Sequence, residues 1–154
     1  LEAEQEIEEA GVDRSYDLPM MINSGITGRV ASGLLVTLGG QWSGWSTLDG
    51  ALAADGGARD SWAIRGGVEA DGFELFGRPL PVRIGARHEQ LPFRFGGGDN
   101  DWANETAYSA GTGLVLGGTA QLDLAVERGQ RGGAAAGLDE SYWRIIFSTS
   151  VLGR

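Results

Sequence analysis

The sequence predicts an all-β fold, an antiparallel transmembrane β-barrel, and three observations support this prediction. From residue 18 onward, apolar and polar residues alternate with a period of two, as in strands that have two different faces. Seven such runs occur, each of about 10 to 13 residues, close to the roughly 9 to 11 residues with which a tilted strand crosses a bilayer. The segments between the runs are alternately short and long, which is typical of outer-membrane barrels.

Composition excludes several other classes of protein. The 154 residues suffice for one domain or for part of a larger one. Twelve Arg, no Lys and a net charge of −9 give nucleic-acid binding little electrostatic support. Without Cys there are no disulfides, thiolate metal sites or Cys nucleophile. Five Trp, five Phe and three Tyr are too many large apolar side chains for a disordered chain.

Residues 1–17 form an acidic opening segment, in which seven acidic residues against one Arg give a net charge of −6. We expect a solvated loop or a short exposed helix without chemistry of its own. Residues 18–152 are then the strand domain.

The seven runs are expected to form strands, each with one apolar face. In chain order they cover residues 18–29, 33–45, 61–70, 80–90, 105–116, 119–129 and 141–152. Run by run, the large apolar side chains on these faces are Met20, Ile22 and Ile26; Leu34, Val36, Leu38 and Trp42; Trp62, Ile64 and Val68; Val82 and Ile84; Tyr108, Leu114 and Leu116; Leu122, Leu124 and Val126; Trp143, Ile145, Phe147 and Val151. No charge is assigned to these faces.

The opposite faces hold nine charged residues: Arg65, Glu69, Arg83, Arg87, Glu89, Glu105, Asp123, Glu127 and Arg144. Alternation by itself also fits a soluble β-sandwich, but charges of both signs in mid-strand beside Gly, Ser and Thr favour a polar lumen. We expect these charges to pair across strands and to stiffen the lumen wall. Seven of them are also candidates for a substrate path: Arg65, Glu69, Arg83, Arg87, Asp123, Glu127 and Arg144. Arg83 and Arg87 are the candidates to receive a carboxylate head group.

The connections and the aromatic residues give a consistent orientation. With the last strand ending in the periplasm, the long segments 46–60, 91–104 and 130–140 are external, 117–118 is periplasmic, and the acidic opening is external. Four aromatic residues then lie on the outward face at the external rim, where we expect a membrane-interface girdle. They are Trp42, Trp62, Tyr108 and Trp143, and Tyr16 would extend the girdle to the first strand.

Several segments carry a resemblance to a known family. They read ADGFELFGRPLPVRIGARHEQLPF over 70–93, NETAYSAGTGLVLGGTAQLDLAVERGQRG over 104–132 and LDESYWRIIFSTSVL over 138–152, preceded by LPMMINSGITGRV and QWSGWS. Over residues 16–152 the chain resembles the C-terminal half of the FadL-type outer-membrane transport family, above all its PorV-like branch. The resemblance implies a barrel of fourteen strands, of which these seven are the second half, with hydrophobic substrates, an N-terminal plug and a lateral opening. An odd strand count also favours a partial barrel, because bacterial single-chain barrels have even counts.

Three other features have structural interpretations. His88 is the single histidine and falls on the outward face near the external rim, without a nucleophile motif beside it. Asp99, Asn100, Asp101 and Glu105 offer oxygen ligands for Ca²⁺, but their spacing does not fit the twelve-residue calcium loop. We expect a loop there, and no metal or other cofactor. Glycine pairs at 39–40, 66–67 and 117–118 serve turns and close packing.

The function expected from the sequence is a non-enzymatic one, uptake or transport of hydrophobic, fatty-acid-like compounds across the bacterial outer membrane. The expected partners are outer-membrane lipid, a hydrophobic substrate and the barrel-assembly machinery, with no nucleic acid. Two alternatives remain open. One is a PorV-like barrel that acts as a scaffold or shuttle in protein secretion, and the other is a soluble ligand-binding β-domain.

Overall fold

The computed structural model describes residues 18–47, 58–94, 102–116, 120–133 and 138–151. The expected acidic segment 1–17, Tyr16 and the Asp99, Asn100 and Asp101 group lie outside the described residues. Among the described residues, no helix combines the length and the apolar character that a membrane span requires.

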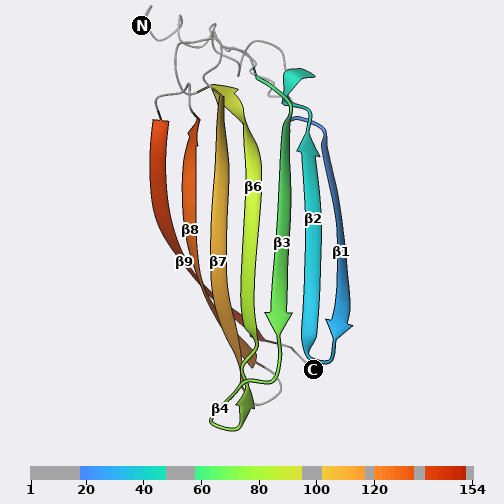
Figure 1. Ribbon diagram of the computed structural model, residues 1–154, viewed down its shortest axis with the longest axis vertical. Helices are drawn as coiled ribbons and strands as arrows, with labels where there is room; N and C mark the ends of the chain where they lie inside the picture. The colour runs from blue at the N-terminus through green and yellow to red at the C-terminus, as the bar shows by residue number, and fades with distance from the viewer. Residues whose placement is uncertain (1–17, 48–57, 95–101, 117–119, 134–137, 152–154) are drawn as a thin grey trace, which may run out of the picture.

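Seven long strands form one antiparallel sheet, in the order β1-β2-β3-β6-β7-β8-β9, so that neighbours in the chain are neighbours in space (Figure 1). The strands are β1 Met21–Ala31, β2 Leu34–Ser43, β3 Ser61–Ala70, β6 Val82–Arg94, β7 Trp102–Leu116, β8 Ala120–Gly133 and β9 Leu138–Val151. A 3-10 turn, η1 Trp45–Thr47, follows β2. The sequence prediction of an antiparallel all-β fold with seven strands is confirmed.

The boundaries differ from the prediction at the long connections. β6, β7 and β8 extend into segments expected to be external loops, because strand pairing continues there: Glu105 still pairs with Arg131, and Arg94 with Trp102 beyond a bulge. In β8 the extension was hidden by Gly132 and Gly133, which weaken the alternation on which the prediction relied.

The connection 71–79 contains a small hairpin that the sequence did not predict. β4 Glu74–Leu75 pairs with β5 Arg78–Pro79 at the lower end of the sheet in Figure 1. Its turn places Phe76 at φ 53° and Gly77 at φ 69°, a left-handed backbone that glycine adopts without strain. Two residues per strand are too few for a period to be visible.

The sheet is a single open layer, in which the described part of β1 pairs with β2 alone and that of β9 with β8 alone. The described residues form an open antiparallel sheet and do not form a closed barrel. The buried apolar residues among those described are three alanines, Ala63, Ala103 and Ala107, while many large apolar side chains are exposed. The sheet is thus held together by its backbone ladders and by contacts between side chains on one face.

Candidate functional site: the polar face of the sheet

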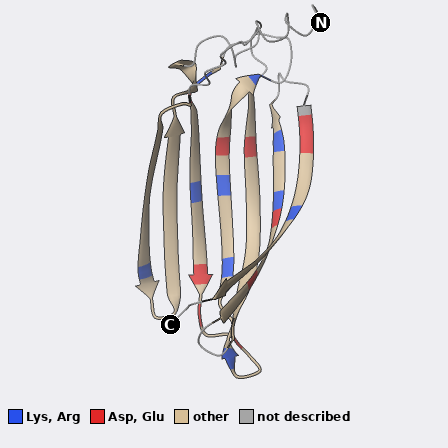
Figure 2. Cartoon of the chain, turned by 180° about the vertical axis from the view of Figure 1, so that it is seen from behind, with Lys and Arg blue, Asp and Glu red and all other residues tan. Residues whose placement is uncertain are grey.

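All nine charges singled out from the sequence lie on one face, which we call the polar face. The register aligns them, because Glu69 is opposite Arg83, Glu105 is opposite Arg131, and side chains alternate along each strand outside the bulges in β1 and β6. Figure 2 shows that the charges gather on β3 and β6 to β9, whereas β2 carries none. The polar face therefore has a charged part and a nearly uncharged part.

Arg87 is the centre of an upper cluster on the polar face. Its Nη2 lies 2.5 Å from Glu105 Oε1 and 3.4 Å from Glu127 Oε1, and its Nη1 lies 3.2 Å from Glu89 Oε2. Glu105 and Glu89 are directly opposite each other, a placement that is unfavourable for like charges. Arg87 bridges the two carboxylates and removes that repulsion. Glu105, whose side chain is 5% exposed, is the most buried member.

Two further residues complete the bonding of Glu105. Arg131 donates from Nε at 2.9 Å and from Nη2 at 2.6 Å to Glu105 Oε2. The Tyr142 hydroxyl donates to Glu105 Oε1 at 2.7 Å and accepts from Arg87 Nη2 at 2.8 Å. Both carboxylate oxygens are thus bound by charged or phenolic donors, which is what burial of a carboxylate requires.

Tyr142 reaches this cluster by crossing a neighbouring strand. It belongs to β9, and Glu105 belongs to β7, so the ring spans β8. Gly129 is its direct partner on β8, and a Cβ there would come within 2.2 Å of the ring carbon Cζ. Position 129 therefore requires glycine, because any side chain there would clash with the Tyr142 ring.

A lower cluster has the same construction. Arg83 bonds through Nε to Glu69 and through Nη1 to Asp123 Oδ1 at 2.6 Å, while Gln121 donates to Asp123 at 2.8 Å. Arg83 is on β6 and Asp123 on β8, so the guanidinium crosses β7. A Cβ at Gly113 would lie 2.6 Å from Asp123 Oδ1 and 3.3 Å from Arg83 Nη1. Again a glycine on the middle strand makes room for a link between its two neighbours.

The cross-strand pairing expected of the charges is present, with one exception. Glu127 pairs with Arg144 at 3.3 Å, and every guanidinium in the two clusters has a carboxylate partner. Arg65 has none within 4.0 Å among the described residues. Its Nη2 donates instead to the Gln41 amide oxygen at 2.9 Å, although it lies directly opposite Arg87.

This arrangement revises the expected head-group site. Arg83 and Arg87 were the candidates for an incoming carboxylate, but both are already bound to carboxylates of the sheet. Arg65 lines two shallow grooves on the polar face, of about 260 and 300 Å³. The role of the seven candidates as a substrate path remains a prediction.

Sequence reasoning missed Arg131, Glu140, Tyr142 and Gln121. The first two lie in the segment 130–140, which was assigned to a loop, although Arg131 continues the alternation from Glu127. Tyr142 and Gln121 carry no charge, so a count of charged positions passed over them. Their parity, which matches that of the charged residues, is the signal that could have found them.

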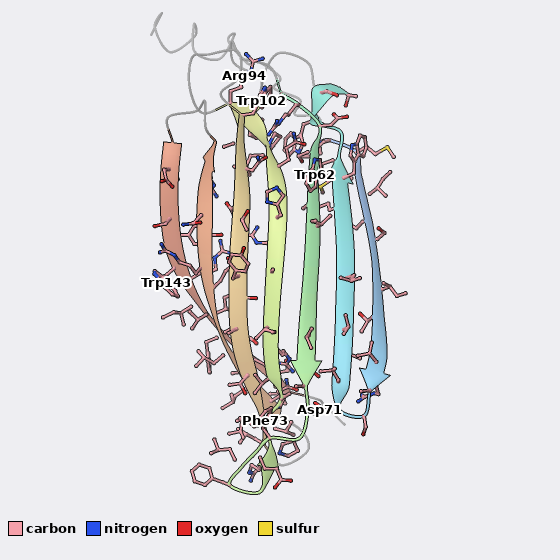
Figure 3. All side chains as sticks on the ribbon, viewed as in Figure 1. Trp62, Asp71, Phe73, Arg94, Trp102 and Trp143 are labelled. Carbon is pink, nitrogen blue, oxygen red and sulfur yellow. The ribbon has the colours of Figure 1, made fainter. Side chains whose placement is uncertain are left out.

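The opposite, apolar face carries the four expected girdle residues. Trp42 and Trp62 are direct partners, and Tyr108 and Trp143 flank Arg128 on the other half of the sheet. Figure 3 shows Trp62 on β3 and Trp143 on β9. All four side chains are exposed, and their place at a membrane interface remains a prediction. The prediction that this face carries no charge is wrong at one position. Arg128 lies on this face, with its guanidinium carbon 5.3 Å from the Trp143 ring centroid.

The upper rim has its own polar contacts. The Ser46 hydroxyl donates to Asp60 Oδ1 at 2.5 Å and the Ser46 backbone amide at 3.0 Å, and these bonds lower the pKa of the Asp60 carboxyl. Nearby, Trp102 has the guanidinium carbons of Arg59 and Arg94 at 4.6 and 4.9 Å from its ring centroid. These contacts tie the start of β3 to the ends of β6 and β7, where Figure 3 labels Arg94 and Trp102.

The described part of the chain assembles no metal site. No group of three or more His, Asp or Glu side chains there has a metal-binding arrangement. Glu105, the described member of the expected oxygen-ligand group, is bound by Arg87 and Arg131. His88 lies on the apolar face as expected, with Nδ1 2.8 Å from the Thr106 hydroxyl oxygen.

Comparison of the chain with protein-family models, curated proteins and solved structures finds no match. The resemblance to the FadL-type family therefore rests on the quoted sequence segments.

Proposed function

We propose that the sheet is part of the wall of an outer-membrane β-barrel, with the polar face toward the lumen and the apolar face toward lipid, and that the barrel passes hydrophobic compounds. The observation that carries this proposal is the separation of chemistry between the two faces, to which Arg128 on the apolar face is an exception. One face holds the ion-pair clusters around Arg83 and Arg87, and the other exposes large apolar side chains.

The apolar face is unsuited to water. Its exposed large side chains are Ile22, Ile26, Leu38, Trp42, Trp62, Ile64, Ile84, Tyr108, Leu124, Val126, Trp143, Ile145, Phe147 and Val151. Soluble monomers rarely expose a contiguous apolar patch larger than a few hundred Å². Lipid can cover such a face without a second protein layer. Strands of 10 to 15 residues are long enough to cross the hydrocarbon core of a bilayer.

The wall needs additional strands on both sides. In lipid, the outer edges of β1 and β9 would leave backbone amide and carbonyl groups without partners, at a cost of several kcal/mol each. Further strands that pair with these edges close the barrel, as the family resemblance implies for a wall of fourteen strands. Insertion would then depend on the barrel-assembly machinery.

The polar face supports passage of uncharged molecules over ions. The carboxylates and guanidinium groups of the two clusters are paired, and a permeating molecule therefore meets few unpaired charges. The lower cluster keeps one net negative charge, because Arg83 is its single cation and bonds to both Glu69 and Asp123. Arg65, beside the two clusters, is bonded to the neutral Gln41 amide and has no carboxylate within 4.0 Å among the described residues. A lumen of this kind suits hydrophobic compounds better than it suits a selective ion channel.

Trp fluorescence of the full chain in lipid vesicles tests the membrane part of the proposal. Trp143 and Trp62 lie on the apolar face, so lipids brominated on their acyl chains should quench the emission, whereas aqueous acrylamide should quench it weakly. A chain that stays in the aqueous phase without detergent would overturn the proposal. Uptake of a hydrophobic fluorophore into vesicles that hold the chain, compared with empty vesicles, tests transport, and equal rates would refute it.

A further inference from the structure

The half of the polar face that β1 and β2 form contains a groove that lies outside the two ion-pair clusters. It is the larger of the two grooves lined by Arg65, with a volume of about 300 Å³. Gly25 and Gly39 are direct partners on β1 and β2 and form its floor, because neither has a side chain. The atoms found within 4 Å of a Cβ built at Gly25 belong to the backbone. A ligand can therefore lie directly against the strands there.

The cation of this groove is Arg65, whose guanidinium lies on the side of β2. The side chain extends over Gly39, where a Cβ would be 3.2 Å from Arg65 Cγ, and Nη2 donates to Gln41 Oε1 at 2.9 Å. Arg65 thus points away from Arg87, its direct partner on β6, as expected for like charges that face each other. This direction brings the guanidinium to the groove.

The charge of Arg65 has no countercharge in the described part of the chain. β1 and β2 contain no Asp or Glu (Figure 2), and no carboxylate lies within 4.0 Å of Arg65 among the described residues. Beyond its bond to Gln41, the guanidinium has N–H groups that can bind both oxygens of one carboxylate. Asn23, which also lines the groove, adds an amide donor. The groove is therefore complementary to a single carboxylate.

The dimensions of the groove favour a compact ligand. Asn23 and Thr27 flank Gly25 along β1 and are four residues apart, or about 13 Å at roughly 3.3 Å per residue. The two side chains take up part of that length, so a single ring fits over Gly25, whereas a long alkyl chain would extend past them. The peptide groups exposed at the glycines are flat, and a guanidinium stacks on aromatic rings, so both surfaces suit a planar ring.

We propose that this groove binds a small aromatic carboxylate, with the carboxylate on Arg65 and the ring over Gly25. The inference rests on the proposed function, because the groove lies on the path of a permeating compound only if the polar face borders a lumen. It narrows the hydrophobic compounds to rings that carry one negative charge. The lower cluster, with one net negative charge, would repel such a compound and leave Arg65 as its place of binding.

Isothermal titration calorimetry of the full chain in detergent micelles tests this proposal, with sodium benzoate as the probe and the heat of empty micelles subtracted. We expect one saturable site, weaker binding of cyclohexanecarboxylate, whose ring is not planar, and no binding of uncharged benzyl alcohol. Arg65→Gln should weaken benzoate binding about tenfold or more. Arg29→Gln is the matched control and should leave binding unchanged, because Arg29 is an exposed arginine on the same face outside the groove.

Gly25→Ala places a methyl group on the floor and should weaken binding several-fold, whereas Gly28→Ala, on the other face, should not. Equal binding of benzoate by the wild type and Arg65→Gln would overturn the proposal, as would equal binding of benzoate and either of the other two compounds. If Gly25→Ala fails to fold, Arg65→Gln still decides, because Arg65 is exposed and its loss should cost little stability. Quenching by brominated lipids together with benzoate binding that does not depend on Arg65 would refute the site and leave the barrel proposal intact.

Discussion

Removing the Arg87 guanidinium tests whether the upper cluster stabilises the sheet. In Arg87→Met, Glu105 loses a charge-assisted hydrogen bond of 2.5 Å, worth about 1.5 to 3 kcal/mol when such bonds are removed. The 2.8 Å bond to the Tyr142 hydroxyl contributes roughly 1 kcal/mol, and the longer contact with Glu89, about a third exposed, adds at most a few tenths. The free energy of unfolding should therefore fall by about 3 kcal/mol.

That value is near the lower end of the roughly 3 to 5 kcal/mol typical of breaking a buried ion pair. Glu105 explains why, because it keeps the bonds from Arg131 and Tyr142 after Arg87 is gone. Arg65→Met is the matched control. It removes the guanidinium directly opposite Arg87, but Arg65 is exposed and bonded to a neutral amide, so the loss should be about 0.5 kcal/mol.

Urea unfolding of the full chain in detergent, followed by Trp fluorescence, measures both variants at equal slope of free energy against denaturant. A loss below about 1 kcal/mol for Arg87→Met would refute the assignment of stability to the cluster. An equal loss for Arg65→Met would refute it as well, since the effect would then belong to any guanidinium on this face.

Two further predictions follow from local geometry. Gly129→Ala should cost about 1 to 3 kcal/mol in the same unfolding assay, because its Cβ would displace the Tyr142 ring, whereas Gly28→Ala, with open space around its Cβ, should cost far less; similar costs would contradict the argument. Because the bonds from Ser46 lower the pKa of Asp60 below 3.8, the stability they add is present above that pH and is lost as the pH falls through the lowered value. Acid titration of the wild type should show this loss and Asp60→Asn should not, and identical curves would contradict the link.

The strands were predictable because a period of two survives wherever one face must be apolar. The nine charges were correctly assigned to one face for the same reason, since parity along each strand fixes the side. Parity does not fix register between strands. The register places Arg87 opposite Ala107 and Arg65, and Arg87 bonds to Glu105 in the neighbouring row. Because the sequence does not give this register, it could not show which cation would lack a carboxylate.

The end of β8 escaped prediction for a related reason. The alternation around Arg131 is interrupted by three glycines, Gly129, Gly132 and Gly133. Because glycine has no side chain, the segment resembles a loop in the sequence, and in the structure it leaves room for neighbouring side chains. Tyr142 passes over one of these glycines. The property that obscured the strand in the sequence is therefore the one that the upper cluster requires.

Some of the many glycines have a specific structural role in this sheet. In an ordinary antiparallel sheet, side chains contact the adjacent strand, and each contact stabilises one pair. Here Arg83 and Tyr142 link strands that are not adjacent, because Gly113 and Gly129 on the middle strands leave space for them. Each such link fixes three strands at once. Both links lie within β6 to β9, so side chains stabilise this half of the sheet. Between β1 and β2 the side-chain contacts include single hydrogen bonds such as that of Thr27 with Thr37. Side-chain links across three strands thus stabilise one half of the sheet and not the other. We therefore expect the sheet to become more rigid from β1 toward β9, although backbone hydrogen bonds connect all seven strands.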